Sequence, residues 1–251
     1  MEGEHFQNSL LTNESNSPSA VRFQFIEEVT SHNNVTLALA SLDVNVTSTF
    51  DSVWHDGLIC KLNKLKLPHY LTNYLISFVQ NTTATIEIEN TLSRSFNHNS
   101  GTPQGSPLSP LLYIIYTTNS MNGIPQHTEH GLFADDTALW ASSNTIASLS
   151  SRLQESIDEF QSWCKSWKLK LQPTKIELIH FTIQPRRKFK NPLSVKIDDI
   201  VIKSSNSTRY LGIIIDKMLN WRNHLHHIES KIAGRISLLC FLNRAAYEPN
   251  D

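Results

Sequence analysis

Two adjacent carboxylates, Asp135 and Asp136, interrupt the apolar segment LFADDTALW at residues 132–140. The flanking residues are typical of buried strands, yet burying one unpaired carboxylate costs several kcal/mol, and two neighbouring like charges also repel each other. The segment must therefore form a solvated turn between two strands, or a site where bound cations compensate the charge. On this spacing alone, a polar hairpin turn with no further role is the simpler interpretation.

The rest of the chain mixes predicted helices and strands. Helices are predicted at 21–29, 52–66, 71–78 after a break at Pro68, from Ser109 as N-cap with Pro110 as first helical residue, at 149–167 and at 225–239. Strands are predicted at 35–44, 169–171, 176–183 and 209–216, with hairpins that turn at Asn90 and at Asp198–Asp199. The order along the chain mixes runs of strands with runs of helices, which favours an α+β fold with an antiparallel sheet over a doubly wound fold.

Composition limits the class of protein. The formal net charge is −1, so the overall field indicates neither nucleic-acid nor membrane attraction, and any such partner must be recognised locally. The three cysteines have neither zinc-site nor disulfide-framework spacing, which favours a reducing compartment. The longest apolar run, at 108–116, is too short to span a membrane, so an intracellular, soluble protein without a membrane partner is expected.

A third carboxylate follows the same logic. The predicted strand at 35–44 ends on Asp43, which would join the pair at 135–136 if that strand lies beside the hairpin in the sheet. Ligands that are all oxygen favour Mg²⁺ or Mn²⁺ over zinc. Two such ions about 4 Å apart support in-line displacement at a phosphoryl group, the chemistry of polymerases and nucleases.

Five segments occur in the order and approximate spacing of one known family. They are SLDV…TFDSVWHDGLICKL, GTPQGSPLSPLLYIIYTTNSM, LFADDTALWASS, LKLQPTKIELIHF and RYLGIIIDKMLNW. Together they resemble the reverse transcriptase of non-LTR (LINE-type, jockey-like) retrotransposons, over residues 21–242. The resemblance implies the palm of a right-handed polymerase at 21–215 with residual fingers, a polar remnant of the fingers region at 1–20, and the start of the thumb or connection at 216–251.

The resemblance also implies an activity and its partners. The activity is RNA-directed DNA polymerisation, in which dNTPs are added to a DNA primer on an RNA template. Asp43 and Asp135 resemble the catalytic aspartates that bind Mg²⁺ or Mn²⁺, and Asp136 resembles their less directly ligating neighbour. An RNA-binding protein encoded by the same element is a further expected partner. An active element of this kind would work in the cytoplasm and the nucleus.

The remaining site residues are assigned by the same resemblance. The aromatic gate against a ribose 2′-hydroxyl is Phe50; the loop against the nascent base pair is Pro103, Gln104 and Gly105; the lysine near the triphosphate is Lys175; and the primer-grip strand is Tyr210, Leu211 and Gly212. Physical arguments support the loop, because a rigid proline and a bare glycine let backbone approach a base pair closely. The simpler alternatives are an ordinary turn for the loop and a solvated charge for the lysine.

The chain departs from the family pattern in two ways. The family usually reads D-x-x-x-A-F-D in the first acidic block, whereas residues 43–51 read DVNVTSTFD, two residues longer and without the alanine. Along an extended path this would displace Phe50 by about 6–7 Å, unless a bulge or loop absorbs it. The upstream fingers segments and the rest of the thumb are also expected to be missing, so the chain resembles a truncated piece of an element.

These departures leave alternatives open. The first is a catalytically inactive, degenerate fragment of a retrotransposon with at most weak nucleic-acid binding. A two-metal nuclease would use the same aspartates, but it would leave the PQG loop and the primer-grip strand without a role.

Overall fold

The computed structural model describes residues 36–43, 49–80, 82–133, 136–181 and 192–246, with backbone alone at 36–43, 49 and 244–246. The predicted helix at 21–29 therefore lies outside the described residues. Among the described residues, helices and antiparallel strands are mixed, which confirms the predicted α+β class.

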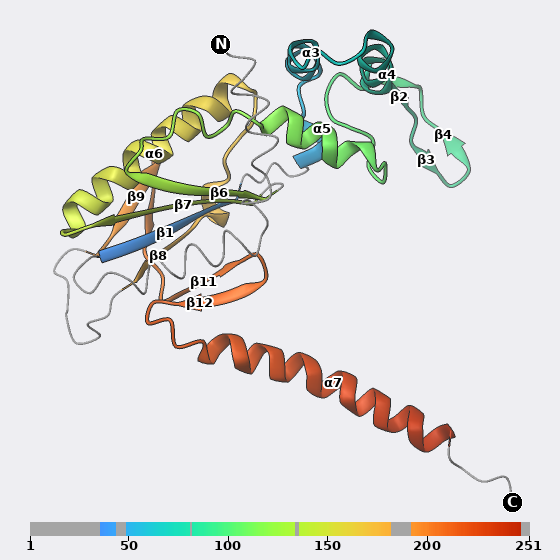
Figure 1. Cartoon of the computed structure of the whole chain (residues 1–251). Helices are drawn as coiled ribbons and strands as arrows, with labels where there is room; N and C mark the ends of the chain where they lie inside the picture. Colours follow the sequence, from blue (N-terminus) through green and yellow to red (C-terminus); the bar gives the residue numbers. More distant parts are fainter. Residues whose placement is uncertain (1–35, 44–48, 81, 134–135, 182–191, 247–251) are drawn as a thin grey trace, which may run out of the picture.

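A four-stranded sheet forms the centre of the fold, in the order β6-β7-β1-β8 (Figure 1). The strands are β1 (Thr36–Asp43), β6 (Thr128–Phe133), β7 (Asp136–Ser143) and β8 (Glu177–Phe181). All three neighbouring pairs are antiparallel. The predicted strand that ends on Asp43 thus lies directly beside the hairpin that carries the two aspartates, as the metal-site hypothesis required.

The two faces of the sheet pack against different elements. Leu139 and Ala141 belong to a core cluster with the long helix α6 (Ile146–Ser166), whereas Ala138 and Trp140 pack with Tyr210 and its hairpin. Successive strand residues point to opposite faces, so the continuous apolar run of β7 is explained by burial on both sides. This alternation fixes the face of every residue of β7, including Asp136.

A helical region precedes β6 in the chain. It contains a 3-10 helix η2 (Thr49–Ser52), the helices α3 (His55–Lys64), α4 (His69–Val79) and α5 (Leu108–Thr117), and the short strands β2 (Thr83–Ala84), β3 (Glu87–Ile88), β4 (Thr91–Leu92) and β5 (Phe96–Asn97). The predicted hairpin at Asn90 is confirmed, since β3 pairs with β4. Glu89 and Asn90 both have positive φ, as a tight two-residue turn requires.

The C-terminal part continues with short hairpins and a long helix. Its elements are η3 (Pro173–Lys175), β9 (Ser194–Ile197), β10 (Ile200–Lys203), β11 (Ser207–Tyr210), β12 (Ile213–Asp216) and α7 (Arg222–Ala246). The predicted hairpin at Asp198–Asp199 is confirmed by the pairing of β9 with β10. Helix α7 extends away from the sheet (Figure 1), and its apolar residues from Leu225 to Leu242 are exposed.

Three sequence predictions were wrong in detail. Residues 209–216 form a hairpin rather than one strand, because Leu211 and Gly212 take positive φ between β11 and β12. Residues 169–171 are not a strand; the chain leaves α6 through Lys168 at positive φ, and the Leu169 amide donates to the Cys164 carbonyl. Helix α5 begins at Leu108, so Ser109 is not its N-cap.

The start of α6 gives a prediction about stability. Thr145 is the N-cap, and its hydroxyl accepts a hydrogen bond from the Ser148 amide at 3.2 Å. Thr145→Ala should lower the free energy of unfolding by about 1 kcal/mol, because an amide of the first turn loses its partner. Chemical denaturation of this variant beside Thr145→Ser, which keeps a hydroxyl, measures the loss; equal stabilities would contradict the capping role.

Candidate polymerase active site

Asp43 and Asp136 are directly opposed across the antiparallel pair of β1 and β7, at the end of the sheet. Directly opposed Cα atoms lie about 4.5–5.5 Å apart, and like charges at such positions destabilise a sheet. Position 136 has the same parity as Ala138 and Trp140, so it lies on the face that hairpin β11–β12 covers rather than on the face of α6. Asp135 immediately precedes it and lies outside the described residues.

The carboxylate residues at this end of the sheet suit a divalent cation. Asp136 is half-buried, and β1 ends on a second aspartate, Asp43, which is directly opposite it in the register. Oxygen ligands of this kind suit Mg²⁺ or Mn²⁺. Among the residues whose side chains are described, which include neither Asp43 nor Asp135, no three His, Cys, Asp or Glu side chains are grouped so that they could hold a metal ion.

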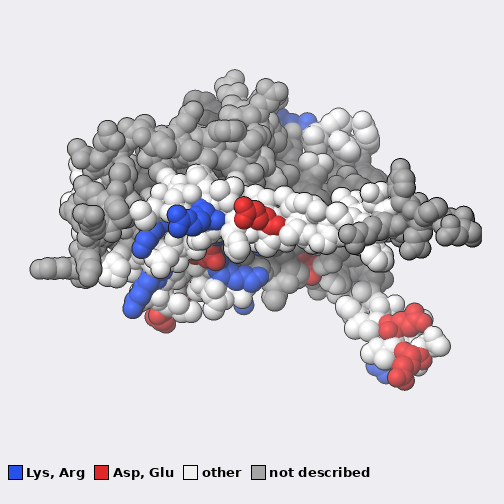
Figure 2. Space-filling view, turned by 90° about the horizontal axis from the view of Figure 1, so that it is seen from below, with Lys and Arg blue, Asp and Glu red and all other residues white. Residues whose placement is uncertain are grey.

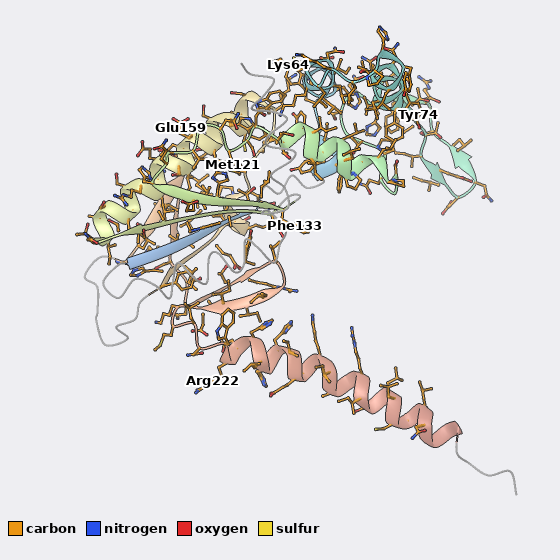
Figure 3. All side chains as sticks on the ribbon, in the orientation of Figure 1. Lys64, Tyr74, Met121, Phe133, Glu159 and Arg222 are labelled. Atoms are coloured by element: carbon orange, nitrogen blue, oxygen red, sulfur yellow. The ribbon has the colours of Figure 1, made fainter. Side chains whose placement is uncertain are left out.

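Lys175 and Phe133 lie at the same end of the sheet as Asp43 and Asp136. The β1–β8 pairing ends with Ser41 opposite Glu177, and Lys175 lies two residues beyond Glu177, in the direction of Asp43. Lys175 is exposed at the end of η3. Phe133 is opposite Asp136 in the β6–β7 register, and its exposed side chain extends away from the sheet (Figure 3). The structure thus brings three of the assigned residues, Asp43, Asp136 and Lys175, to one end of the sheet.

The segment that carries Phe50 is bound to the loop that carries the PQG motif. The Thr102 amide donates to the Phe50 carbonyl at 2.7 Å, and the Gly101 amide donates to the Val53 carbonyl at 2.8 Å. His55 is buried, and its Nε2 lies 2.7 Å from the Gly101 carbonyl oxygen. Phe50 is half-buried, with its ring edge-on to Tyr113 at a centroid distance of 5.7 Å. Residues 44–48, which hold the two-residue insertion, lie outside the described residues.

Gly101 is required for this close approach. Its φ is +91°, and a Cβ built there would lie 2.7 Å from the Asp51 Cα. A side chain at this position would therefore clash with backbone and strain its own dihedral angles. Of the two glycines in GTPQG, only Gly105 was assigned a role from the sequence. It is Gly101 that allows the two segments to approach each other.

Pro103, Gln104 and Gly105 are all exposed at the tip of the same loop. The Pro103 carbonyl accepts a hydrogen bond from the Ser109 hydroxyl at 2.5 Å, so Ser109 stabilises the loop rather than the helix end. Gly105 has a φ of +84° with open space around it. The Gln104 Nε2 donates to the Asp51 carboxylate, at 3.1 Å from Oδ1 and 3.3 Å from Oδ2.

The assigned primer-grip residues occupy hairpin β11–β12. Tyr210 is buried against the sheet, and Leu211 and Gly212 form the turn. Glu177, at the start of β8, fixes this hairpin to the sheet, because its Oε2 accepts hydrogen bonds from the Thr208 hydroxyl and the Arg209 amide. The hairpin therefore packs on the face of the sheet that includes position 136.

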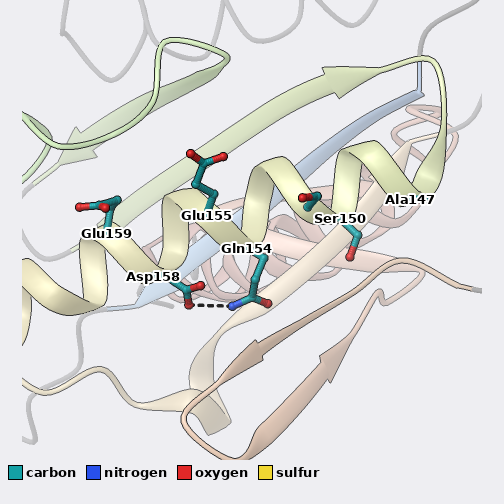
Figure 4. Close-up of a pocket in the computed structure, with 7 residues that line it drawn as sticks. Ala147, Ser150, Gln154, Glu155, Asp158 and Glu159 are labelled. Atoms are coloured by element: carbon teal, nitrogen blue, oxygen red, sulfur yellow. Dashed lines mark hydrogen bonds between the residues drawn. The ribbon is translucent and has the colours of Figure 1, made fainter.

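Charges are mixed on the face of the molecule that carries helix α7. Seen from the side of α7, Lys and Arg side chains lie beside Asp and Glu side chains without a continuous basic surface (Figure 2). A shallow hollow elsewhere is lined entirely by α6, from Ala147 to Glu159, and is acidic (Figure 4). Helix α6 covers the opposite face of the sheet from position 136, so this hollow is not part of the candidate site.

Comparison with known proteins identifies the family of this chain. The family profile described as "Reverse transcriptase (RNA-dependent DNA polymerase)" matches residues 5–215. The chain is 32% identical over 206 residues to the probable RNA-directed DNA polymerase from transposon BS of Drosophila melanogaster, covering 79% of this chain and 22% of that protein. It is 28% identical over 259 residues to the polymerase from mobile element jockey of Drosophila funebris, covering 94% and 27%. The chain thus spans about a quarter of the length of these relatives.

Solved structures show the same fold at low sequence identity. Apo telomerase from Candida tropicalis, truncated from its C-terminal domain, superposes with a TM-score of 0.59 at 12% identity, over 86% of this chain and 43% of that one. Telomerase from the same organism in complex with a fragment of telomeric RNA gives a TM-score of 0.57, over 86% and 36%. None of the helices described here is long and apolar enough for a membrane span. The chain belongs to the reverse transcriptase family, as a domain of the jockey-like, non-LTR retrotransposon type.

Proposed function

We propose that this chain acts as an RNA-directed DNA polymerase, which adds dNTPs to a DNA primer on an RNA template. The observation that carries the proposal is the register of β1 and β7. It places Asp43 directly opposite Asp136 at the ends of the two central strands, and Asp135 precedes Asp136 in the chain. Like charges at directly opposed positions repel each other, and the positive charge of a bound cation compensates them. A two-metal nucleotidyl-transfer site supplies that charge.

Asp43, Asp135 and Asp136 would hold Mg²⁺ or Mn²⁺ as oxygen ligands. When bound, two such ions favour deprotonation of the attacking hydroxyl and neutralise charge on the transferred phosphoryl group. The carboxylates also orient the reacting groups, because a rigid antiparallel pair fixes their backbone positions. Lys175, at the same edge, supplies a compact positive charge for the triphosphate of the incoming nucleotide.

The other assigned residues would position the primer, template and nucleotide. Phe50, supported by Tyr113, would exclude a ribose 2′-hydroxyl, and Pro103, Gln104 and Gly105 would lie against the nascent base pair. Tyr210, Leu211 and Gly212 would support the primer end from hairpin β11–β12. In this arrangement residues 21–215 form the palm with residual fingers, residues 1–20 belong to the fingers region, and residues 216–251 begin the thumb.

Primer extension by the purified chain tests the proposal. With an RNA template, an annealed DNA primer, dNTPs and Mg²⁺ or Mn²⁺, we expect primer elongation that stops on chelation of the metal. The Asp135→Ala variant is the negative control, and its extension at the native rate would contradict the two-metal site. Cleavage of nucleic acid without added dNTPs would indicate a nuclease instead.

An inactive fragment is the second candidate, and the longer spacing of DVNVTSTFD at 43–51 favours it. If the native chain extends no primer, a variant with the family's D-x-x-x-A-F-D spacing separates the alternatives. Recovery of extension would identify the insertion as the defect. Failure of both chains to extend a primer, together with no RNA binding at low salt, would leave the fragment without a nucleic-acid function.

A further inference from the structure

The side chains of Asp51 and Gln104 are hydrogen-bonded to each other. Backbone hydrogen bonds already join the two segments that carry them, residues 50–54 and the loop at 100–104. The amides of Gly101 and Thr102 donate to carbonyls of residues 50–53, and Trp54 pairs with Ser100 in an isolated bridge. These backbone contacts hold the loop in place without any contribution from the Asp51 carboxylate. The side-chain hydrogen bond from Gln104 therefore needs another explanation than loop folding.

The chemistry of the pair fixes which end of the Gln104 amide faces Asp51. An ionised carboxylate only accepts hydrogen bonds, whereas a glutamine amide has a donor end, Nε2, and an acceptor end, Oε1. Nε2 lies 3.1 and 3.3 Å from the two oxygens of Asp51. A flipped amide would place Oε1 against the carboxylate, where two acceptors repel each other. The acceptor end of Gln104 consequently faces away from Asp51.

We propose that Asp51 is a positioning residue that holds the Gln104 amide in one orientation, so that Oε1 is presented to the nucleotide or base pair as a hydrogen-bond acceptor. This inference rests on the proposed polymerase function, because it gives Gln104 a substrate to face. Gln104 is exposed, and an exposed hydrogen bond of this kind contributes little to stability. Its consequence is orientation, which matters for a group that must meet a donor on the substrate.

Steady-state incorporation of a single dNTP tests the proposal. Asp51→Ala should lower kcat/KM by roughly three- to tenfold, as expected for the loss of one oriented hydrogen bond. Gln104→Ala should lower it at least as much. The double variant should be no worse than Gln104→Ala alone, because Asp51 acts only through that side chain.

Asp56→Ala is the matched control. Asp56 is an exposed carboxylate in the same segment and accepts a hydrogen bond from Trp54 Nε1 at 3.2 Å. Its replacement should leave kcat/KM unchanged. Effects of Asp51→Ala and Gln104→Ala that multiply in the double variant, or an equal loss in Asp56→Ala, would overturn the positioning role.

A measurement without catalysis separates this inference from the polymerase proposal. The side-chain amide resonances of Gln104, assigned by their absence in Gln104→Ala, should shift in Asp51→Ala and stay in place in Asp56→Ala. That result in a chain that extends no primer would retain the pairing and reject the polymerase. Unchanged resonances in Asp51→Ala would overturn the positioning role even in an active chain.

Discussion

Primer extension by the Asp136→Asn variant is expected to fall by roughly 10²-fold or more relative to the native chain. The substitution preserves the size of the side chain and the position opposite Asp43, but it replaces a charged oxygen ligand with a neutral amide. Rates measured at saturating Mg²⁺ on one primer and template give the ratio. Asp199→Asn is the control, since Asp199 is fully exposed on the β9–β10 turn.

Mg²⁺ binding is also expected to distinguish the stability of this variant from that of the native chain. Added Mg²⁺ should stabilise the native chain by mass action and stabilise the variant less. Chemical denaturation with and without Mg²⁺ measures both effects. A variant that polymerises at the native rate would contradict the role of Asp136.

Local signals in the sequence were sufficient for most of the fold. The apolar run at 35–44 and the periodicity at 149–167 predicted β1 and α6 because each pattern depends only on burial of one or two faces. The errors occurred where a few residues decide the geometry. Gly212 permits a turn inside what otherwise reads as one strand. The Ser109 hydroxyl donates to the Pro103 carbonyl instead of capping the helix, which begins one residue earlier, at Leu108.

The candidate site was likewise predicted only in part from the sequence. That Asp43 would lie beside the aspartate hairpin was predicted as a condition, and the β1–β7 register confirms that placement. Asp51 and His55 were missed, although both are in the quoted block TFDSVWHDGLICKL. Their hydrogen-bond partners lie about fifty residues later, in the loop at 101–104, and no local sequence pattern predicts a hydrogen bond over that separation. A polar residue on the buried side of a helix, such as His55, is the signal that could have indicated a hydrogen bond to a distant segment.

Lys61 is a second residue of this kind and is the basis of the last prediction. It is a buried lysine on α3 whose Nζ donates to the Tyr116 carbonyl and to Asn119 Oδ1. Its Nζ also lies 3.9 Å from the centroid of the Trp167 ring. Because Tyr116 is on α5 and Trp167 follows α6, Lys61 links three separate elements.

Lys61→Ala is expected to lower the free energy of unfolding by about 3 kcal/mol at pH 7. The truncation leaves a cavity among aromatic rings and two oxygen atoms without a donor. Lys61→Met fills most of the space and should lose less. Chemical denaturation of both variants beside Lys203→Met, an exposed lysine on β10, measures the losses. A loss in Lys61→Ala no larger than that in Lys203→Met would contradict a structural role for the Lys61 side chain.

The pH dependence of stability should also change in Lys61→Met. Burial lowers the pKa of Lys61 from 10.5 to about 7, with nearby Lys64 lowering it further and Cys60 opposing the shift. Between these two values the unfolded chain keeps a proton that the folded chain has lost, so this lysine makes stability rise with pH, by at most about 1.4 kcal/mol per pH unit. Below pH 7 both states are charged, and the folded state carries the full cost of burying the ammonium group.

Other buried groups near Lys61 act in the opposite direction. Burial raises the pKa of Tyr116 and of Cys164 to about 12, so above their ordinary values the unfolded chain loses protons that the folded chain retains, and stability falls. The difference between the native chain and Lys61→Met removes these shared contributions. That difference should move in favour of the native chain from pH 7 to pH 10. If it is independent of pH, Lys61 has the same pKa in the folded and unfolded chains, and its environment does not disfavour the charge.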